Sequence, residues 1–217
     1  MKLTLSKNEY KGALIAICGV DGSGKTTLEE RLFEELSLEH RCSRTYQPTQ
    51  WWRKDANVRR TVYGEPGGTP LPDRAVALFS LADRYAHQSS YLVPHLSDGE
   101  VVISNRYIFT VFAFFMARGS VDMAWLAAAA RDIIKPDVCF YLDAPADVLT
   151  ERVRKRDGDA AERFDQDPEF VERFNVAFRA LARDNGIVTL QAEQPTEKLV
   201  TQCIDAMRAS EALRASS

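Results

Sequence analysis

The chain of 217 residues lacks an apolar run long enough to cross a lipid bilayer. One long apolar run, residues 107–117, falls well short of the roughly 20 residues that a membrane-spanning helix needs. Another, residues 13–20, is followed by Asp21-Gly22-Ser23-Gly24-Lys25 and not by the small-residue cleavage site of a secretory signal. We therefore expect a cytoplasmic protein with no membrane partner.

An excess of basic residues is also missing. The 28 Lys and Arg residues face 31 Asp and Glu residues, so the formal net charge is −3. Broad, nonspecific binding to nucleic acid depends on clustered Lys and Arg side chains that neutralise phosphates. This charge balance argues against a nucleic-acid partner, and it leaves room for a local anion pocket.

Cysteine is scarce and scattered. The four cysteines are Cys18, Cys42, Cys139 and Cys203, with no Cys-x-x-Cys pair and no histidine at zinc-ligand spacing. We expect reduced, mostly buried thiols.

What is present is an alternation of apolar strand-like runs with helical periodicity, which is typical of a parallel sheet covered by helices. Strands are predicted for residues 13–18, 44–46, 101–104, 138–142 and 187–190. Helices are predicted for residues 26–38, 75–92, 121–134, 146–156 and 168–183, with one more helix at the C-terminus. Residues 64–73, rich in Gly and Pro, are predicted to form a loop. No stretch resembles an interdomain linker, so a single α/β domain is expected over residues 1–217.

The strongest motif lies between the first predicted strand and helix. Gly19-Val20-Asp21-Gly22-Ser23-Gly24-Lys25-Thr26 matches the P-loop pattern G-x-x-x-x-G-K-[ST] in the context that it requires. Glycines let backbone N–H groups turn around phosphate oxygens, and the helix N-terminus adds positive potential. Lys25 would contact the β- and γ-phosphates, and Thr26 would offer its hydroxyl to Mg²⁺. The predicted nucleotide-binding residues are Gly19, Asp21, Gly22, Ser23, Gly24, Lys25, Thr26 and Thr27.

Two further segments carry polar residues that a buried framework does not need. In the first, Asn105-Arg106-Tyr107 follows a predicted strand, at the sheet edge where ligands of open α/β sheets bind. In the second, Arg152 and Arg156 lie one helical turn apart in a basic run, and Arg163 follows. Beside a P-loop that contains no arginine, this run favours a mobile lid over residues 152–165.

Together these segments resemble the thymidylate kinase family of P-loop nucleoside monophosphate kinases. The resemblance covers nearly the whole length and includes Leu78-Phe79-Ser80-Leu81-Ala82-Asp83-Arg84, similar to the family's substrate helix. It implies a three-layer P-loop fold with a short lid, and transfer of the ATP γ-phosphoryl group to a (deoxy)nucleoside monophosphate. Thymidylate (dTMP) is the first acceptor to test. It also implies Mg²⁺ as cofactor and a homodimer.

The resemblance assigns roles to individual residues. Lys25 and Arg106 would act on the transferred phosphoryl group, with Arg106 bridging the donor and acceptor phosphates, and Arg152, Arg156 and Arg163 would add lid charge. Mg²⁺ would be held by Thr26 and by Asp21, through water. The implied substrate-binding residues are Asp21, Pro48, Arg59, Phe79, Arg84, Arg106 and Tyr107. Among them, Arg59 would hold the acceptor phosphate and Arg84 would reach the base.

Several positions depart from the family pattern. Asn105 replaces an aspartate that would help to organise Mg²⁺, so we expect weaker magnesium binding or a larger share carried by Thr26 and Asp21. Gln47 and Cys18 stand where many members carry glutamate, and Ser23 stands where some carry arginine. Glu65-Pro66-Gly67-Gly68-Thr69 spells a bacterial family signature, but it lies beyond the expected position, which we assign to 47–49.

Base recognition is left with two alternatives. Phe79 precedes Arg84 by five residues, about 500° of helix, so the two side chains lie roughly 140° apart. Either Ser80 and Arg84 face the substrate, or Phe79 and Asp83 do and a carboxylate reads the base. Phe115 stands where a polar residue often reads the base.

Two other functions of the protein stay open, a kinase for a different small acceptor and a nucleotide-binding protein of low activity.

Overall fold

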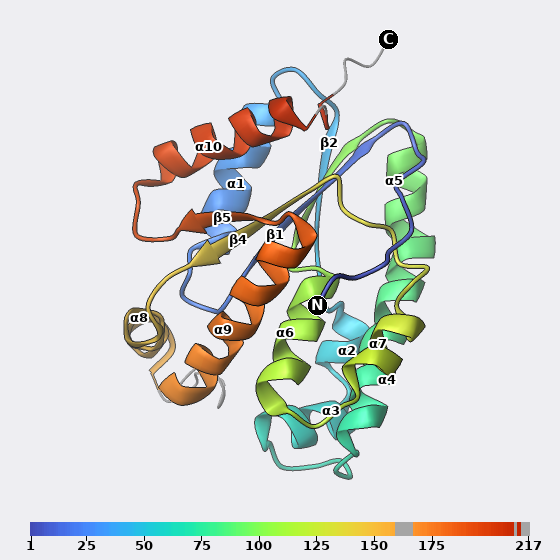
Figure 1. Ribbon diagram of the computed structural model, residues 1–217, viewed down its shortest axis with the longest axis vertical. Helices are drawn as coiled ribbons and strands as arrows, with labels where there is room; N and C mark the ends of the chain where they lie inside the picture. The colour runs from blue at the N-terminus through green and yellow to red at the C-terminus, as the bar shows by residue number, and fades with distance from the viewer. Residues whose placement is uncertain (159–166, 211, 214–217) are drawn as a thin grey trace.

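The computed structural model describes residues 1–158, 167–210 and 212–213. Its centre is a five-stranded parallel sheet in the order β2-β3-β1-β4-β5 (Figure 1). The strands are β1 (Ala13–Gly19), β2 (Cys42–Tyr46), β3 (Val101–Asn105), β4 (Val138–Asp143) and β5 (Val188–Gln191). These confirm the five predicted strands, with ends that shift by one or two residues. The parallel arrangement brings all five carboxyl ends to one edge of the sheet.

Helices cover both faces of the sheet, as predicted. On one face α1 (Lys25–Leu36) packs against α10 (Thr196–Ala209), and on the other α6 (Ile108–Arg118) packs against α9 (Pro168–Asn185) (Figure 1). Every residue of β1 is buried, because a strand between two layers has no solvent-exposed face. The three-layer α/β fold is confirmed.

One predicted helix changes its form along its length. Residues 75–92 were expected to form one helix, whereas the structure has α4 (Asp73–His87), the π-helical segment η2 (Gln88–Leu92) and α5 (Val93–Ser97). Pro94 has no amide hydrogen and cannot donate the usual bond to the residue four positions earlier, so the chain adopts wider turns there.

The helix predicted over residues 121–134 is too long, because α7 covers only Met123–Ala129. Asp122 caps its first turn by accepting hydrogen bonds from the amides of Ala124 and Trp125, at 2.9 and 3.2 Å. The following residues leave the helix because other segments hold them. The amide of Ile134 donates to the side chain of Gln88 at 2.8 Å, and the N-terminal segment pairs with residue 134 in an isolated bridge.

Besides α5, four helical segments in the described part of the chain were not predicted. α2 (Gln50–Arg53), α3 (Ala56–Val58) and η1 (Arg59–Tyr63) are too short to show periodicity, and α6 was noted only as an apolar run. α8 (Ala146–Asp157) was predicted, and it packs against the loop between β1 and α1. The predicted loop is confirmed over residues 64–72, before α4 begins at Asp73.

The cysteines are free thiols, as predicted, and Cys42 is only partly buried. Cys18 and Cys139 are distant in sequence, yet their sulfur atoms lie 3.9 Å apart in the core between β1 and β4.

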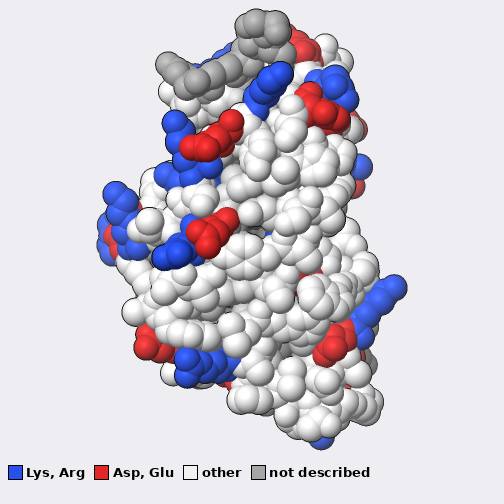
Figure 2. Space-filling model, turned by 90° about the vertical axis from the view of Figure 1, so that its right-hand side faces the viewer, with Lys and Arg blue, Asp and Glu red and all other residues white. Residues whose placement is uncertain are grey.

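Within the described residues, none of the helices combines the length and apolar character that crossing a bilayer requires. On the side of the molecule that lies at the right of Figure 1, the charged residues are few and scattered (Figure 2).

Candidate active site

The loop between β1 and α1 is shaped to receive phosphate groups. Gly24 is the N-cap of α1 in the left-handed conformation, so no side chain caps the first amides of the helix. These amides and the helix dipole point to the cleft at the sheet edge. Gly22 has φ +82°, and a Cβ atom there would lie 2.8 Å from the carbonyl oxygen of Leu149, so only glycine fits. This geometry leaves the backbone of the P-loop open to the cleft, as a phosphate cradle requires.

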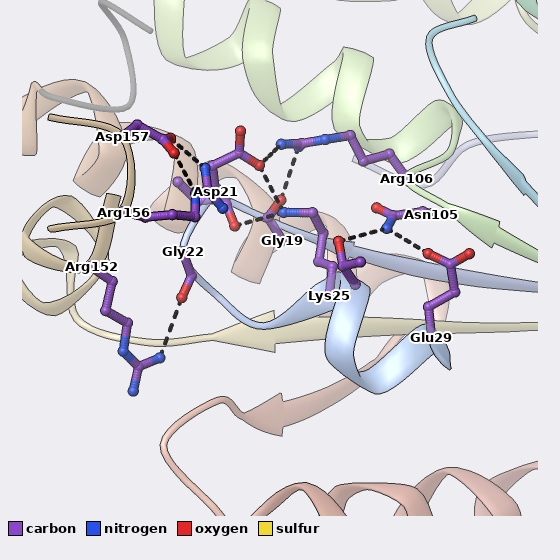
Figure 3. Close-up of polar contacts among 12 residues, drawn as sticks. Gly19, Asp21, Gly22, Lys25, Glu29, Asn105, Arg106, Arg152, Arg156 and Asp157 are labelled. Carbon is purple, nitrogen blue, oxygen red and sulfur yellow. Dashed lines mark hydrogen bonds and ion pairs between the residues drawn. The ribbon is translucent and has the colours of Figure 1, made fainter. Parts of the chain in front are cut away.

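Two cations converge on one carboxylate of the P-loop. Lys25 is buried, and its Nζ donates to the carbonyl of Val20 at 2.8 Å and to Asp21 at 3.0 Å. The guanidinium of Arg106 donates to the carbonyl of Gly19 at 3.0 Å and forms an ion pair with Asp21 (Figure 3). The Arg106 charge is the main reason that the pKa of Asp21 lies well below its usual range, and Lys25 adds to it. Phosphate oxygens at this site would meet the same two cations.

The backbone of Arg106 is strained in a way that directs its side chain. Its φ is +66°, in the left-handed region that costs a non-glycine residue about 1–2 kcal/mol. Its amide donates to the carbonyl of Ile17 at 2.8 Å, and Ser104 Oγ donates to its carbonyl at 2.7 Å. Strain held in place by such bonds is typical of functional positions. It turns the guanidinium from the end of β3 towards the P-loop.

Helix α8 brings two more arginines to the cleft. Arg152 Nη1 donates to the carbonyl of Gly22 at 3.4 Å, and Arg156 is paired with Asp157 at 2.6–2.7 Å (Figure 3). The charge of Arg156 also contributes to the low pKa of Asp21. Both arginines line the cleft. Arg163, the third predicted lid arginine, and most of the tail of the lid lie outside the described residues.

Beside Thr26 lies a carboxylate that the sequence interpretation missed. Asn105 Nδ2 donates to Glu29 Oε2 at 2.7 Å and approaches Thr26 Oγ1 at 3.5 Å (Figure 3). Glu29 is only 8% exposed, and burial raises its pKa although the Asn105 hydrogen bond acts in the opposite direction. Thr26, Glu29 and Asn105 all line the cleft.

The deeper end of the cleft decides between the two base-reading alternatives. Ser80 and Arg84 line the cleft, which has a volume of about 840 Å³. Asp83 is fully buried on a different side of α4, where its carboxylate accepts hydrogen bonds from the amide and hydroxyl of Thr49. Phe79 packs edge-to-face on Trp51, with ring centroids 4.8 Å apart. The structure therefore brings the Ser80 and Arg84 face to the site.

Arg84 is a buried cation with an unused donor. It is 3% exposed, and burial lowers its pKa to about 10. Nη1 donates to the carbonyl of Ser80 at 2.8 Å, whereas Nε has no hydrogen-bond partner among the described residues. A bound base can supply the missing acceptor.

Three predicted substrate residues are not in the cleft wall that the described residues form. Besides Phe79, these are Tyr107, whose buried hydroxyl donates to the carbonyl of Ile134 at 2.8 Å, and Arg59. Arg59 forms a bidentate ion pair with Glu65 and donates to the carbonyl of Arg53 at 3.0 Å. Glu65 is the first residue of the Glu65-Pro66-Gly67-Gly68-Thr69 segment, so this segment supplies the carboxylate that pairs with Arg59.

Two P-loop residues support the cleft from beneath. The carbonyl of Gly19 accepts the hydrogen bond of Arg106, and Ser23 is 1% exposed. Both were predicted to bind the nucleotide, but neither lines the cleft. The remaining predicted nucleotide residues do, as does Pro48. Residues of the wall that the sequence interpretation missed include Glu29, Tyr46, Gln50, Trp52, Arg53, Val62, Tyr63, Phe114, Phe170, Val171 and Phe174.

Comparison with known proteins identifies the family. The model of the thymidylate kinase family matches residues 17–203, most of the chain. The chain belongs to the thymidylate kinase family. A probable thymidylate kinase of Thermococcus kodakarensis is 35% identical over 150 residues, which cover 65% of this chain and 71% of that protein. The thymidylate kinase of Latilactobacillus sakei is 28% identical over 89% of this chain and 93% of its own length. That of Carboxydothermus hydrogenoformans is 30% identical, over 87% and 93%.

Membership of the thymidylate kinase family decides between the three functional interpretations. The chain is a nucleoside monophosphate kinase that uses ATP and Mg²⁺. The donor set at the P-loop fits this metal, because Mg²⁺ prefers oxygen ligands and is usually held by one or two carboxylates together with substrate phosphates. Thr26 offers a hydroxyl and Glu29 a carboxylate at the same place. Within the described residues no group of three or more His, Cys, Asp and Glu side chains forms a cage that would hold a metal by itself.

Proposed function

We propose that the acceptor is dTMP and that Arg84 reads its base. The observation that carries this proposal is the position of Arg84, buried in the cleft wall with an unused Nε donor, while Asp83 is turned away and held by Thr49. A guanidinium donates only, so it favours a base that presents a carbonyl, such as thymine or uracil, over one that presents an amine. The names of the relatives support the same acceptor.

At the other end of the cleft, the proposed mechanism is positioning and charge neutralisation. Lys25 and the P-loop amides would hold the ATP phosphates, and Arg106 would bridge the donor and acceptor phosphates from the end of β3. No strong general base is needed, because the attacking oxygen of the acceptor phosphate is already ionised. Bound Mg²⁺ would neutralise charge on the β- and γ-phosphates.

Arg152 and Arg156 would add positive charge to the transferring phosphoryl group. They already line the cleft, and Arg163 stays a prediction from the resemblance.

Arg59 would reach the acceptor phosphate only after its ion pair with Glu65 opens, whereas Arg53 already lines the cleft. Arg53 is therefore the stronger candidate for holding that phosphate. Asp21 would face the substrate sugar or a metal-bound water once phosphates compete for Lys25 and Arg106.

A coupled ADP-release assay tests this proposal. ATP is held constant, and dTMP, dUMP, dCMP, dAMP and dGMP are compared as acceptors. We expect the highest kcat/KM with dTMP and lower values with the two amine-presenting bases of dCMP and dAMP. A preference for dCMP or dAMP would contradict the role of Arg84, and turnover with none of the five would contradict the acceptor class. The guanine nucleotide, which also presents a carbonyl, shows whether a purine fits the cleft.

The homodimer and the cytoplasmic location stay predictions from the resemblance and from composition. The dimer proposal has support on the side shown in Figure 2, where charge is sparse. Leu78 on α4 is 49% exposed, so this helix presents a large apolar side chain to a partner. Light scattering coupled to gel filtration should give twice the mass of the chain, 24.4 kDa, for the wild type and a smaller mass for Leu78→Glu. An unchanged mass in the variant would place the interface elsewhere.

A further inference from the structure

The pairing of Glu29 with Asn105 is unusual for a buried carboxylate. Glu29 is 8% exposed, and its hydrogen bond comes from a neutral amide at 2.7 Å. The field of Arg44 reaches Glu29, but the guanidinium lies over the ring of Phe33, and no cation forms an ion pair with Glu29 among the described residues. Buried carboxylates are normally paired with a cation or coordinate a metal. Within the described part of the chain, the Glu29 carboxylate therefore has a hydrogen bond but no ion pair.

The position of Glu29 indicates which cation would pair with it. Glu29 follows Thr26 by three residues on α1, so the two side chains are neighbours on one helix face. Asn105 is the last residue of β3 and reaches both of them (Figure 3). The metal that uses the Thr26 hydroxyl would have the Glu29 carboxylate as its neighbour.

Asp21, the carboxylate of the P-loop, is less suited to holding a metal ion beside Thr26. Asp21 is ion-paired with both Arg106 and Lys25, so two cations already offset its charge. Asn105, which stands where the family pattern has an aspartate, contributes no charge. Glu29 is the carboxylate near Thr26 whose charge is not offset by an ion pair in the described structure.

We propose that Glu29 is a positioning residue for magnesium. It supplies from α1 the negative charge that an aspartate at position 105 would supply from β3, and the amide of Asn105 holds its carboxylate beside Thr26. In this arrangement the negative charge beside Thr26 comes from the helix, one hydrogen bond away from the last residue of the strand. This inference rests on the use of ATP and Mg²⁺, and it does not depend on which acceptor the enzyme phosphorylates.

The test measures how strongly Mg²⁺ and ADP assist each other's binding to the full chain. Calorimetric titration gives the dissociation constant of ADP with Mg²⁺ and with EDTA, and the ratio of the two measures the metal's contribution. No acceptor is present, so an incorrect assignment of dTMP would leave the result unchanged. Four proteins are compared, namely the wild type, Glu29→Gln, the double variant Glu29→Gln/Asn105→Asp and the control Glu30→Gln. Glu30 is exposed on the same helix, so its variant removes the same charge without entering the cleft.

Loss of a group that orients a metal site typically costs 10–100-fold in metal affinity. We expect the magnesium contribution to fall at least about tenfold in Glu29→Gln, to remain within about twofold of wild type in Glu30→Gln, and to recover to within about threefold in the double variant. Recovery would show that the charge, and not the shape of Glu29, is what the metal needs.

Two results would overturn the proposal. Equal ratios in Glu29→Gln and Glu30→Gln would reduce Glu29 to a structural partner of Asn105. A loss in Glu29→Gln that the double variant does not recover would exclude the exchange of charge between the two positions. If Glu29→Gln does not fold, Glu29→Met removes the charge without leaving a polar group buried, and the same thresholds apply. Electron paramagnetic resonance of Mn²⁺, with ADP bound, gives an independent reading of metal affinity for each protein.

Discussion

The carboxylate of Asp21 and the guanidinium of Arg106 form an ion pair across the edge of the sheet, between the P-loop and the end of β3. Lys25 donates to the same carboxylate at 3.0 Å. Two cations that would serve phosphate groups are thus held in place by a residue of the protein. Nucleotide binding would exchange one anion for another, so Lys25 and Arg106 need little rearrangement to meet the phosphates.

Removing either cation should abolish phosphoryl transfer and leave the fold intact. We expect Lys25→Ala and Arg106→Ala each to lower kcat/KM by on the order of 10³-fold or more, because such cations stabilise charge in the transition state. The measurement is the coupled ADP-release assay with dTMP, together with the thermal unfolding midpoint of each variant.

Arg31→Ala is the matched control for these two variants. Arg31 is exposed on α1 and pairs with Glu34 at 2.7 Å, so its loss removes one positive charge away from the cleft. Its kcat/KM should stay within a few-fold of the wild type. Comparable activity in Lys25→Ala or Arg106→Ala and in this control would show that the cation in question has no part in the reaction.

His87 should make the stability of the protein depend on pH. It is 7% exposed, and burial lowers its pKa. Gln47 Nε2 can only donate, so His87 Nδ1 accepts its hydrogen bond at 3.0 Å and Nε2–H donates to Thr45 Oγ1 at 2.7 Å. This pattern requires the neutral ring, and protonation of Nδ1 would break it.

The lowered pKa of His87 determines how the free energy of unfolding changes with pH. The folded pKa lies below the unfolded value of about 6.5, so the contribution of His87 is fully present above that pH and is lost as pH falls from 6.5 through the lower folded pKa. Urea unfolding at several pH values should show a free energy that falls by at most about 1.4 kcal/mol per pH unit from this group. His87→Gln should have a smaller slope below pH 6.5, and His40→Gln, at a less buried position, should keep the wild-type slope. Equal slopes in all three proteins would contradict the prediction.

The fold was largely predictable because the three central strands, β1, β3 and β4, are nearly continuous apolar runs and the P-loop is a local motif. The ends of helices were harder, since they depend on distant partners. Nothing near Ile134 in sequence indicates that Gln88 holds its amide at 2.8 Å and so helps to end the helical region early. The short helices between β2 and α4 have too few turns to show periodicity, and they carry Arg53 into the cleft.

The site was predictable where a motif fixes the geometry, and not where it depends on helix phase. Arg106 follows a buried strand, so its place at the sheet edge was expected. The face of α4 that meets the cleft was left open, and contacts with Thr49 decide it by holding Asp83 elsewhere. Glu29 was missed because α1 contains several glutamates of similar spacing, and only tertiary packing distinguishes the one that faces Asn105.

Restoring an aspartate at position 105 should destabilise the metal-free protein. In Asn105→Asp the amide that donates to Glu29 at 2.7 Å becomes a second carboxylate, so a hydrogen bond is lost and two like charges face each other. We expect a loss of about 1–3 kcal/mol in the free energy of unfolding at pH 7 with EDTA, the usual cost of an unpaired buried group. Chemical denaturation measures it directly.

The double variant Glu29→Gln/Asn105→Asp serves as the control for this loss. It has one carboxylate and one amide at the two positions, as the wild type does, so most of the stability should return. A single variant as stable as the wild type would mean that Glu29 and residue 105 do not interact in solution.

Selectivity for dTMP should be real but moderate. Arg84 can donate to the thymine carbonyl, while Phe115, which is buried in the cleft wall, offers no hydrogen bond to the pyrimidine edge. A wall that lacks a polar reader discriminates by only about 1–3 kcal/mol per methylene-sized feature, whereas ratios of about 10⁴ or more need a site that leaves the wrong substrate's polar partners unpaired. We therefore expect kcat/KM for dTMP to exceed that for dCMP by less than about 10⁴-fold.

The variant Arg84→Ala isolates the part of this selectivity that comes from hydrogen bonding. The ratio of kcat/KM between dTMP and dCMP should fall towards one, because the donor that distinguishes a carbonyl from an amine is gone, while dTMP and dUMP should keep their ratio. Arg41→Ala is the control, since Arg41 is exposed, pairs with Glu100 at 3.0 Å and is not part of the cleft wall described by the structure. A dTMP preference above about 10⁴-fold in the wild type, or an unchanged dTMP to dCMP ratio in Arg84→Ala, would show that another group reads the base.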